Sequence, residues 1–558
     1  MKNHIKRHRL IALSLVLLVT LAGAAWGQQS AGTPAAKAEF EQGEAAFKKQ
    51  DYATAAASYR KAIELDPDFI AAHEKFIAAS AAAARAKSAA AGEQGGSTDT
   101  EVSQSGAIAV YEEWARKYPN KPAIQWALGD LYMYKDYDKV EQYSRKAVEL
   151  DPKFARAWQS LALIEEVRGN NAGQVAYLKK AAEAVPDDPA PLFYYANSLK
   201  RTNRSEYEKA SLQVAERFPQ HERGAQALYW LSFEETNPAR KVELLERLKT
   251  QYPVDKFNWS ASGMSMLFDA YRKSAPSKAA ALAEEMVKAN PTGSQNKTWQ
   301  TLLDYQKNII QARALMAEKK FAEAVTLLGA TQLPRYIDTD DLFLLKAAAI
   351  EGAGQTQQAY DELLKQVAKE PAAALRTELN KLGSKLSKAP AQVEADIWGL
   401  WDAQAKPAKD FTLKHYGDEK DVSLADYRGK VVLLNFWYPF CGPCRGENPS
   451  LQKVLEQIGR EKFAILAVNI YPKEDQFVLP YFKGNRFDFV PLRGNTEFAE
   501  KEWSARGFPT NYLIDPEGRV VFKLGPMRGD AEEQKLELRI RMLLARQAKG
   551  QKGPGSAR

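Results

Sequence analysis

Five prolines recur in the first half of the chain at nearly constant intervals of 33 or 34 residues: Pro119, Pro152, Pro186, Pro219 and Pro253. Each follows a segment whose apolar residues recur at helical spacing. A proline after every second helix, at such a period, is typical of stacked helix pairs. Each pair buries only one face and needs a neighbouring pair to cover it. The spacing therefore predicts an all-α solenoid.

The segment 36–69 carries this pattern most fully. Small residues at helix crossings, an aromatic between them and a terminal proline fall at the expected places: Gly43, Ala55, Tyr59, Ala62 and Pro67. The segment resembles the tetratricopeptide (TPR) repeat. The resemblance predicts a TPR solenoid over 36–371, with a flexible insertion at about 80–104 that is rich in Ala, Gly and Ser. A solenoid implies a concave groove for an unknown protein or peptide, and a packing scaffold is the alternative.

The first 27 residues have the pattern of a secretory signal peptide. A basic segment through Arg9 precedes the apolar stretch 10–24, and small residues lie just before Gln28. The stretch approaches the length of a membrane span, so an uncleaved anchor is the alternative. We expect a periplasmic or secreted protein, either free or tethered to the inner membrane.

The net charge of +8 does not indicate a nucleic-acid surface. Four of the positive charges lie on the N-terminal segment, at Lys2, Lys6, Arg7 and Arg9, which leaves +4 for the rest of the chain. So small an excess of positive charge over more than 500 residues does not indicate a basic surface that would bind a polyanion. Charge alone therefore gives no reason to expect nucleic acid as a partner.

A change of pattern marks a boundary between the solenoid and a second domain. Gly383, Pro390 and Pro407 interrupt the helical spacing, and we expect a linker over 372–405. Trp398 and Trp401 lie inside this range, and large aromatic side chains favour packing against a domain over binding a ligand. The expected linker thus carries two side chains that need a partner surface.

The chain has two cysteines, Cys441 and Cys444, separated by Gly-Pro. Two cysteines are too few for a disulfide framework or a four-thiolate zinc site, and their C-x-x-C spacing is typical of a redox dithiol. The apolar run 431–437 predicts a buried strand before them, and the spacing over 451–458 predicts a helix after them. A helix N-terminus stabilises a thiolate, so Cys441 is the expected nucleophile.

Further strands are predicted at 410–413, 463–469, 510–514 and 520–523, with a last helix from Asp530 to about Lys549 and a disordered tail over 549–558. Together with Cys441-Gly442-Pro443-Cys444 and the later Gly507-Phe508-Pro509-Thr510, the segment 406–548 resembles the TlpA- and ResA-type thiol–disulfide oxidoreductases. The resemblance implies an α/β thioredoxin-like fold after the solenoid, and therefore a multidomain chain.

The resemblance also implies roles for single residues. Cys441 would attack a protein disulfide and Cys444 would resolve the mixed disulfide, so the two form the redox disulfide. Glu447 would accept the proton of Cys444, although a solvated first-turn carboxylate is the alternative. Pro509 would be a cis-proline. The expected substrate-binding residues are Phe508, Pro509, Phe440 and Trp437.

Two positions differ from relatives of the wider fold. Phe440 replaces the tryptophan that usually precedes the first cysteine, which keeps an aromatic ring there. Asn435 occupies the strand position at which thioredoxin has a buried aspartate, and an amide does not accept the proton. The proton relay should therefore fall to Glu447 or to water. Tyr438 stands where a peroxiredoxin has threonine, which argues against a dedicated peroxidase.

The histidines His73, His221 and His415 lack metal-ligand spacing, and no metal site or cofactor is expected. Electrons would pass to or from another dithiol protein, the expected redox partner. The Gly-Pro pair between the cysteines resembles reducing thioredoxins and favours a reductase, although the direction of exchange stays open. The alternative is a TPR interaction scaffold whose thioredoxin-like domain only docks.

Overall fold

The computed structural model describes residues 32–90, 99–133, 135–290, 292–335, 337–527 and 529–550. The expected signal peptide, residues 91–98 of the expected insertion and residues 551–558 of the expected tail lie outside these ranges. The described parts of the expected insertion, 80–90 and 99–104, and of the expected tail, 549–550, are helical. The described chain divides into two compact units. The first runs to Ala227, apart from residues 167–169, and the second begins at Leu228.

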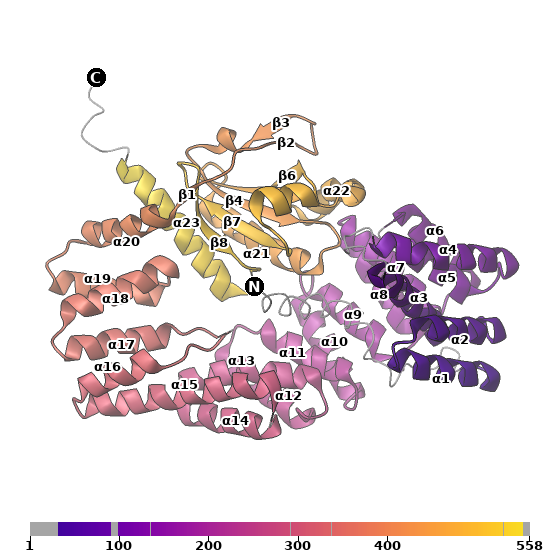
Figure 1. Cartoon of the computed structure of the whole chain (residues 1–558), viewed down its shortest axis with the longest axis horizontal. Coiled ribbons are helices and arrows are strands. Elements are labelled where there is room, and N and C mark those ends of the chain that lie inside the picture. Colours follow the sequence, from indigo (N-terminus) through magenta and orange to yellow (C-terminus); the bar gives the residue numbers. More distant parts are fainter. Residues whose placement is uncertain are drawn as a thin grey trace. The chain divides into compact units, whose positions relative to one another are not determined.

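The first unit consists of helices, most of which pack on the next one along the chain. They are α1 (Pro34–Lys48), α2 (Tyr52–Leu65), α3 (Ile70–Ala90), α4 (Asp99–Lys117), α5 (Pro122–Leu131), α6 (Tyr137–Leu150), α7 (Ala155–Val167), α8 (Asn171–Ala184), α9 (Pro189–Leu199) and α10 (Arg204–Arg217) (Figure 1). Helix α11 (Glu222–Phe233) crosses the boundary between the units.

The pair α1–α2 shows why the expected repeat residues recur. Gly43 lies against the Tyr59 ring, where an added Cβ would come within 2.6 Å of a ring carbon. Only a residue without a Cβ lets the two helices approach so closely. The Tyr59 hydroxyl donates a 2.5 Å hydrogen bond to Glu44. Asp51 caps the N-terminus of α2 by accepting from the Thr54 N–H.

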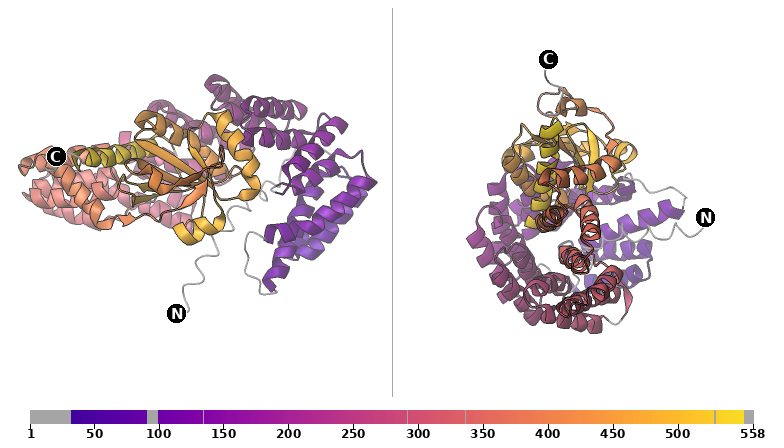
Figure 2. Two further views of the ribbon diagram at one scale, coloured as in Figure 1. Left: turned by 90° about the horizontal axis from the view of Figure 1, so that it is seen from above. Right: turned by 90° about the vertical axis from the view of Figure 1, so that its left-hand side faces the viewer.

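The second unit begins with more helices, which lie side by side in chain order (Figure 2). They are α12 (Pro238–Gln251), α13 (Asn258–Ser274), α14 (Pro276–Ala289), α15 (Gly293–Ala317), α16 (Phe321–Ala330), α17 (Asp340–Gly352), α18 (Thr356–Lys369), α19 (Ala373–Lys385) and α20 (Pro390–Gln404). Part of the expected solenoid thus shares a compact unit with the sheet domain.

The range 372–405 is not the linker that we expected, because α19 and α20 occupy most of it. Gly383 is a helix-crossing residue, since an added Cβ would lie 2.6 Å from Val393. Pro390 stands in the first turn of α20, where its missing N–H costs no hydrogen bond. Trp398 and Trp401 are both buried, as their size predicts. Gly383 and Pro390, which in the sequence indicate a linker, are therefore a helix-packing residue and a helix-start residue.

A six-stranded sheet of order β1-β8-β7-β4-β5-β6 follows. The strands of the domain are β1 (Lys406–Pro407), β2 (Thr412–Lys414), β3 (Asp421–Ser423), β4 (Val431–Trp437), β5 (Phe463–Asn469), β6 (Val490–Arg493), β7 (Thr510–Ile514) and β8 (Arg519–Leu524). Strands β4, β5 and β6 are parallel, whereas β7 runs antiparallel to β4 and to β8. Strands β2 and β3 form a separate antiparallel pair.

The helices of this domain are α21 (Gly442–Ile458), α22 (Asp475–Asn485) and α23 (Asp530–Gly550), with short turns η2 (Leu424–Tyr427), η3 (Pro472–Glu474) and η4 (Phe498–Glu502). All residues of β4 and β5 are buried, as is typical of central strands covered on both faces. Helices α21 and α23 pack on each other and on this sheet. The sheet, with helices against it, is the expected thioredoxin-like fold.

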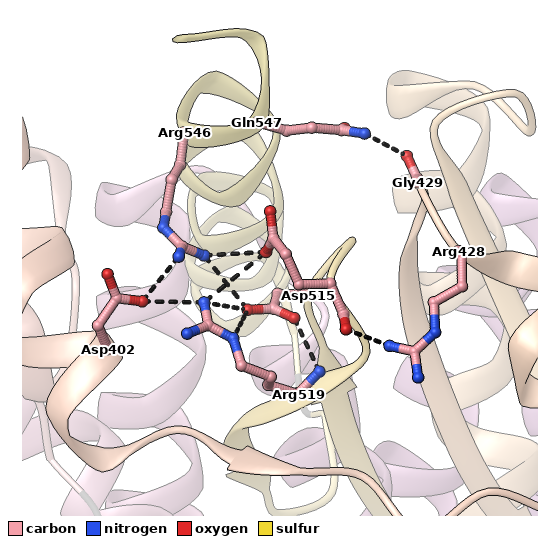
Figure 3. Close-up of polar contacts among 8 residues, drawn as sticks. Asp402, Arg428, Gly429, Asp515, Arg519, Arg546 and Gln547 are labelled. Atoms are coloured by element: carbon pink, nitrogen blue, oxygen red, sulfur yellow. Dashed lines mark hydrogen bonds and ion pairs between the residues drawn. The ribbon is translucent and has the colours of Figure 1, made fainter. Parts of the chain in front are cut away.

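Ion pairs join α20 to β8 and α23 of the sheet domain (Figure 3). The Asp402 carboxylate lies 2.7 Å from Arg546 of α23 and 2.8 Å from Arg519 of β8. Both arginines also contact Asp515, which is buried at the turn between β7 and β8. Trp401 packs its ring 5.3 Å from that of Phe522. Helix α20 is therefore part of the structural support of the sheet domain.

Within the described ranges, no helix combines the length and apolar character that crossing a membrane requires.

Candidate active site

The two cysteines lie at the junction between β4 and α21. Cys441 is the N-cap residue of the helix, and its Sγ accepts a 3.2 Å hydrogen bond from the Cys444 N–H. Pro443 occupies the first turn, where helices tolerate proline. The Cys441 sulfur thus lies at the positive end of the helix dipole, where a thiolate is stabilised.

Cys441 and Cys444 are joined by a disulfide bond. The exposed fraction is 4% for Cys441 and 0% for Cys444. Both cysteines are therefore buried in the disulfide form, and Cys441 keeps the slightly larger exposed fraction.

Glu447 lies one helical turn after Cys444, and its side chain is buried, with 1% exposed. Oε1 accepts hydrogen bonds from the Asn435 amide at 3.0 Å and the Asn511 amide at 3.2 Å. Oε2 accepts from the Met527 N–H at 2.9 Å and from Asn511 at 3.3 Å. The structure therefore contradicts the alternative of a solvated carboxylate.

Burial raises the pKa of Glu447 from its usual value to about 7, because a buried carboxylate loses its hydration. The hydrogen bonds from Met527, Asn511 and Asn435 act in the opposite direction, since they stabilise the ionised form. A pKa near neutrality suits a group that takes up and releases a proton at physiological pH.

The Phe508–Pro509 peptide bond is cis, as the resemblance implies. Pro509 is followed directly by β7, whose first residue Thr510 pairs with Phe436 near the end of β4. This register brings the cis-proline loop to the end of β4 from which the cysteines follow. Phe508 is half-buried, and its ring lies 6.3 Å from that of Tyr438.

Trp437 does not fit the substrate-binding role that we expected. Its side chain is fully buried, and its ring stacks 4.9 Å from Phe482 and 5.5 Å from Tyr481. It is a core residue, because the last residue of a central strand is covered by α22. Phe440 is largely buried as well and packs edge-on against Phe477 of α22, with ring centroids 5.3 Å apart.

The structure adds residues that the sequence patterns do not single out. Glu474 is buried, and its Oε2 accepts a 2.8 Å hydrogen bond from the Phe440 N–H, directly before Cys441. It follows the carboxyl end of β5, where α/β proteins place functional groups, and that position is a signal that could have found it. Asn511 has no comparable signal, because its side-chain partners, Asn435 and Glu447, lie on β4 and α21.

Among the described residues, no group of three or more His, Cys, Asp or Glu side chains has the arrangement to hold a metal ion. His73 is fully buried and bonded to the Tyr111 hydroxyl and the Pro67 carbonyl. His415 bonds to Asp418 in an exposed turn.

Comparison with known proteins gives two family matches. Residues 405–543 match the AhpC/TSA family, and residues 36–69 match the tetratricopeptide repeat. The first match covers the sheet domain from β1 to α23. The second covers the helix pair in which Gly43 faces Tyr59.

Individual relatives match the same C-terminal region. The thioredoxin-like protein YneN of Bacillus subtilis is 33% identical over 142 residues, which are 25% of this chain and 81% of YneN. HelX, a thiol:disulfide interchange protein of Rhodobacter capsulatus, is 31% identical over 24% of this chain and 74% of its own length. The thiol-disulfide oxidoreductase ResA of Oceanobacillus iheyensis is 34% identical, and the chain spans 60% of it.

Proposed function

We propose that this chain, which belongs to the thioredoxin-like thiol–disulfide oxidoreductases, reduces disulfide bonds of protein substrates outside the cytoplasm. The observation that carries the proposal is a disulfide-bonded Cys441–Cys444 pair at a helix N-terminus, with the buried Glu447 carboxyl group one turn further on.

In the reduced enzyme, the Cys441 thiolate attacks one sulfur of a substrate disulfide. A bond forms between Cys441 and that sulfur, and the other substrate sulfur leaves as a thiolate that takes up a proton. Glu447 accepts the proton of the Cys444 thiol. The Cys444 thiolate then attacks the Cys441 sulfur, whose bond to the substrate breaks. The second substrate sulfur leaves as a thiolate and takes up the proton that Glu447 received, and the enzyme is left as the Cys441–Cys444 disulfide. A dithiol protein returns the two electrons and two protons.

The substrate would bind beside the cis-proline loop. Phe508 is half-buried and lies with Tyr438 and Tyr471 in a cluster whose ring centroids are 5.8 to 6.3 Å apart. These rings offer an apolar surface to the chain that flanks a substrate cysteine. Phe508 provides the exposed part of the proposed binding surface, and the buried Pro509 and Phe440 side chains lie beneath its edge. Trp437 lies in the core and is not part of this surface.

The TPR helices would recruit a protein partner, because stacked helix pairs offer extended surfaces for protein binding. The N-terminal basic and apolar segments support export from the cytoplasm. The TPR helices would thus bring a protein substrate to the dithiol, in a compartment outside the cytoplasm where disulfides form.

Two cysteine variants test this function. Cys444→Ser should trap substrates as mixed disulfides with Cys441 that dithiothreitol releases, whereas Cys441→Ser should trap none and lose reduction of an insulin disulfide. A Cys441→Ser protein that keeps wild-type turnover would overturn the proposal and leave a docking scaffold.

Equilibration with glutathione buffers gives the direction of exchange. A reduction potential near that of thioredoxin, about −270 mV, supports a reductase. A potential near −120 mV would instead identify an oxidant that introduces disulfides. The double variant Cys441→Ser, Cys444→Ser is the matched control, since it should show no redox-dependent change.

A further inference from the structure

Asn435 and Asn511 occupy opposite positions on neighbouring strands. They are paired in the register between β4 and β7, and both side chains are fully buried. The Asn435 amide nitrogen donates to the Asn511 side-chain oxygen at 2.8 Å and to Glu447 at 3.0 Å. A buried amide is costly unless it is hydrogen-bonded, so this pair is stabilised by the bonds it makes.

The third donor comes from the main chain. The Met527 N–H, in the segment between β8 and α23, lies 2.9 Å from Glu447 Oε2. All three groups donate toward the carboxyl oxygens, an arrangement that suits an ionised carboxylate because such a group only accepts. The Asn435 side-chain oxygen is buried and makes no hydrogen bond with any described residue.

We propose that Asn435, Asn511 and the Met527 N–H form a donor clamp that positions Glu447 and stabilises its ionised form, the form that accepts the Cys444 proton. The role of Glu447 as acceptor of the Cys444 proton rests on the proposed function, whereas the clamp itself does not. Asn435 and Asn511 are positioning residues, since their contacts are with Glu447 and with each other.

Among the residues that the structure describes, the groups that donate hydrogen bonds to the Glu447 carboxylate are neutral. They are the Asn435 amide from β4, the Asn511 amide from β7 and the Met527 N–H, and the cysteines of α21 are joined in a disulfide. Burial raises the pKa of Glu447 and the three donors lower it, with no charged side chain among the causes. Removal of a donor must therefore move the pKa upward, because the ionised form loses stabilisation.

Asn511→Leu tests the clamp, because leucine has a similar size and donates no hydrogen bond. Asn469→Leu is the matched control. Asn469 is a fully buried asparagine of the same sheet, on β5, and its amide donates to Tyr416, Asp475 and the Tyr471 carbonyl. If Asn511→Leu does not fold, Asn511→Ser withdraws the same amide with a smaller side chain.

The first readout is the carboxyl C=O band in infrared spectra of the full-length oxidised protein, recorded as a function of pH. The band that Glu447→Gln removes belongs to this group. Its midpoint should lie near pH 7 in the wild type. We expect Asn511→Leu to raise the midpoint by about one pH unit, the effect of losing one hydrogen bond to a charged group. The midpoint should not move in Asn469→Leu.

An unchanged midpoint in Asn511→Leu overturns the clamp, and so does an equal shift in the Asn469→Leu control. The second readout is the pH profile of insulin reduction, whose acidic limb should follow the same shift. If the infrared midpoint moves and the limb does not, the clamp stands and the role of Glu447 as proton acceptor fails. The two proposals are thus separated by one set of variants.

Discussion

Glu474 accepts a hydrogen bond from the Phe440 N–H at 2.8 Å, so a buried carboxylate holds the backbone directly before Cys441. The two residues come from different segments, the η3 turn after β5 and the loop after β4. Glu447 lies after the second cysteine of the pair. A buried carboxyl group therefore lies on each side of the active-site turn: Glu474 bonds to the residue before Cys441, and Glu447 follows Cys444.

Glu474→Ala should weaken this part of the domain. It leaves the buried Phe440 N–H without its acceptor, which costs about 1–3 kcal/mol. Glu474→Gln keeps an acceptor oxygen and should lose less. Hydrogen-exchange mass spectrometry of peptides covering β4 and α21 measures the difference. The control Gln476→Ala, at an exposed position in the first turn of α22, should change the opening free energy by under about 0.5 kcal/mol. Equal losses in the Ala and Gln variants would contradict the assigned bond.

The raised pKa of Glu447, about 7, makes stability depend on pH. The unfolded chain ionises this group near pH 4.5, whereas the folded protein keeps its proton to about pH 7. The stabilisation is therefore fully present below pH 4.5 and is lost as the pH rises through 7, by roughly 3 kcal/mol. Glu447→Gln should lack this loss. Pulse proteolysis in urea between pH 4.5 and 7.5 tests it, and parallel pH profiles in the two proteins would refute it.

The support given by α20 is mainly apolar. Trp401 is buried, donates to the Ala368 carbonyl at 2.8 Å and packs on Phe522. Trp401→Ala should lower the stability of the second unit by about 3–5 kcal/mol. Asp402→Ala removes two ion pairs from a side chain that is 44% exposed, and should cost under about 1 kcal/mol. Hydrogen exchange in β8 distinguishes the two, and a greater loss in Asp402→Ala would contradict this ranking.

Gly43→Ala should destabilise the first helix pair. The new Cβ would lie 2.6 Å from the Tyr59 ring, which is fully buried. Overpacking of this kind costs about 1–3 kcal/mol. Hydrogen exchange over α1 and α2 measures the loss. Gly106→Ala is the matched control, since an added Cβ there meets no atom within 4 Å. The second unit should keep its protection in both variants.

The sequence predicts those elements whose signal is local. The runs 431–437 and 463–469 coincide with β4 and β5, because strands buried on both faces are continuously apolar. The C-x-x-C pair predicts its own place at a helix start. The edge strand β6 (Val490–Arg493) was not predicted, since it is short and contains Pro491.

The failures have a common physical cause, which is that a residue's role depended on a distant partner. Gly383 and Pro390 resemble loop residues until Val393 and the first turn of α20 are in place. Trp437 resembles a site residue until Tyr481 and Phe482 cover it. Asn511 acquires its contacts through the β4–β7 register, which no local pattern in the chain specifies.

The environment of Glu447 comes from β4, α21, β7 and the segment after β8. During synthesis, both cysteines leave the ribosome before Asn511 and Met527 have been added. A nascent chain at that point has both thiols, but the groups that surround Glu447, the acceptor of the Cys444 proton, are not yet assembled. The tuned proton acceptor therefore comes into being with the completed domain, so that full competence for exchange is a property of the finished protein.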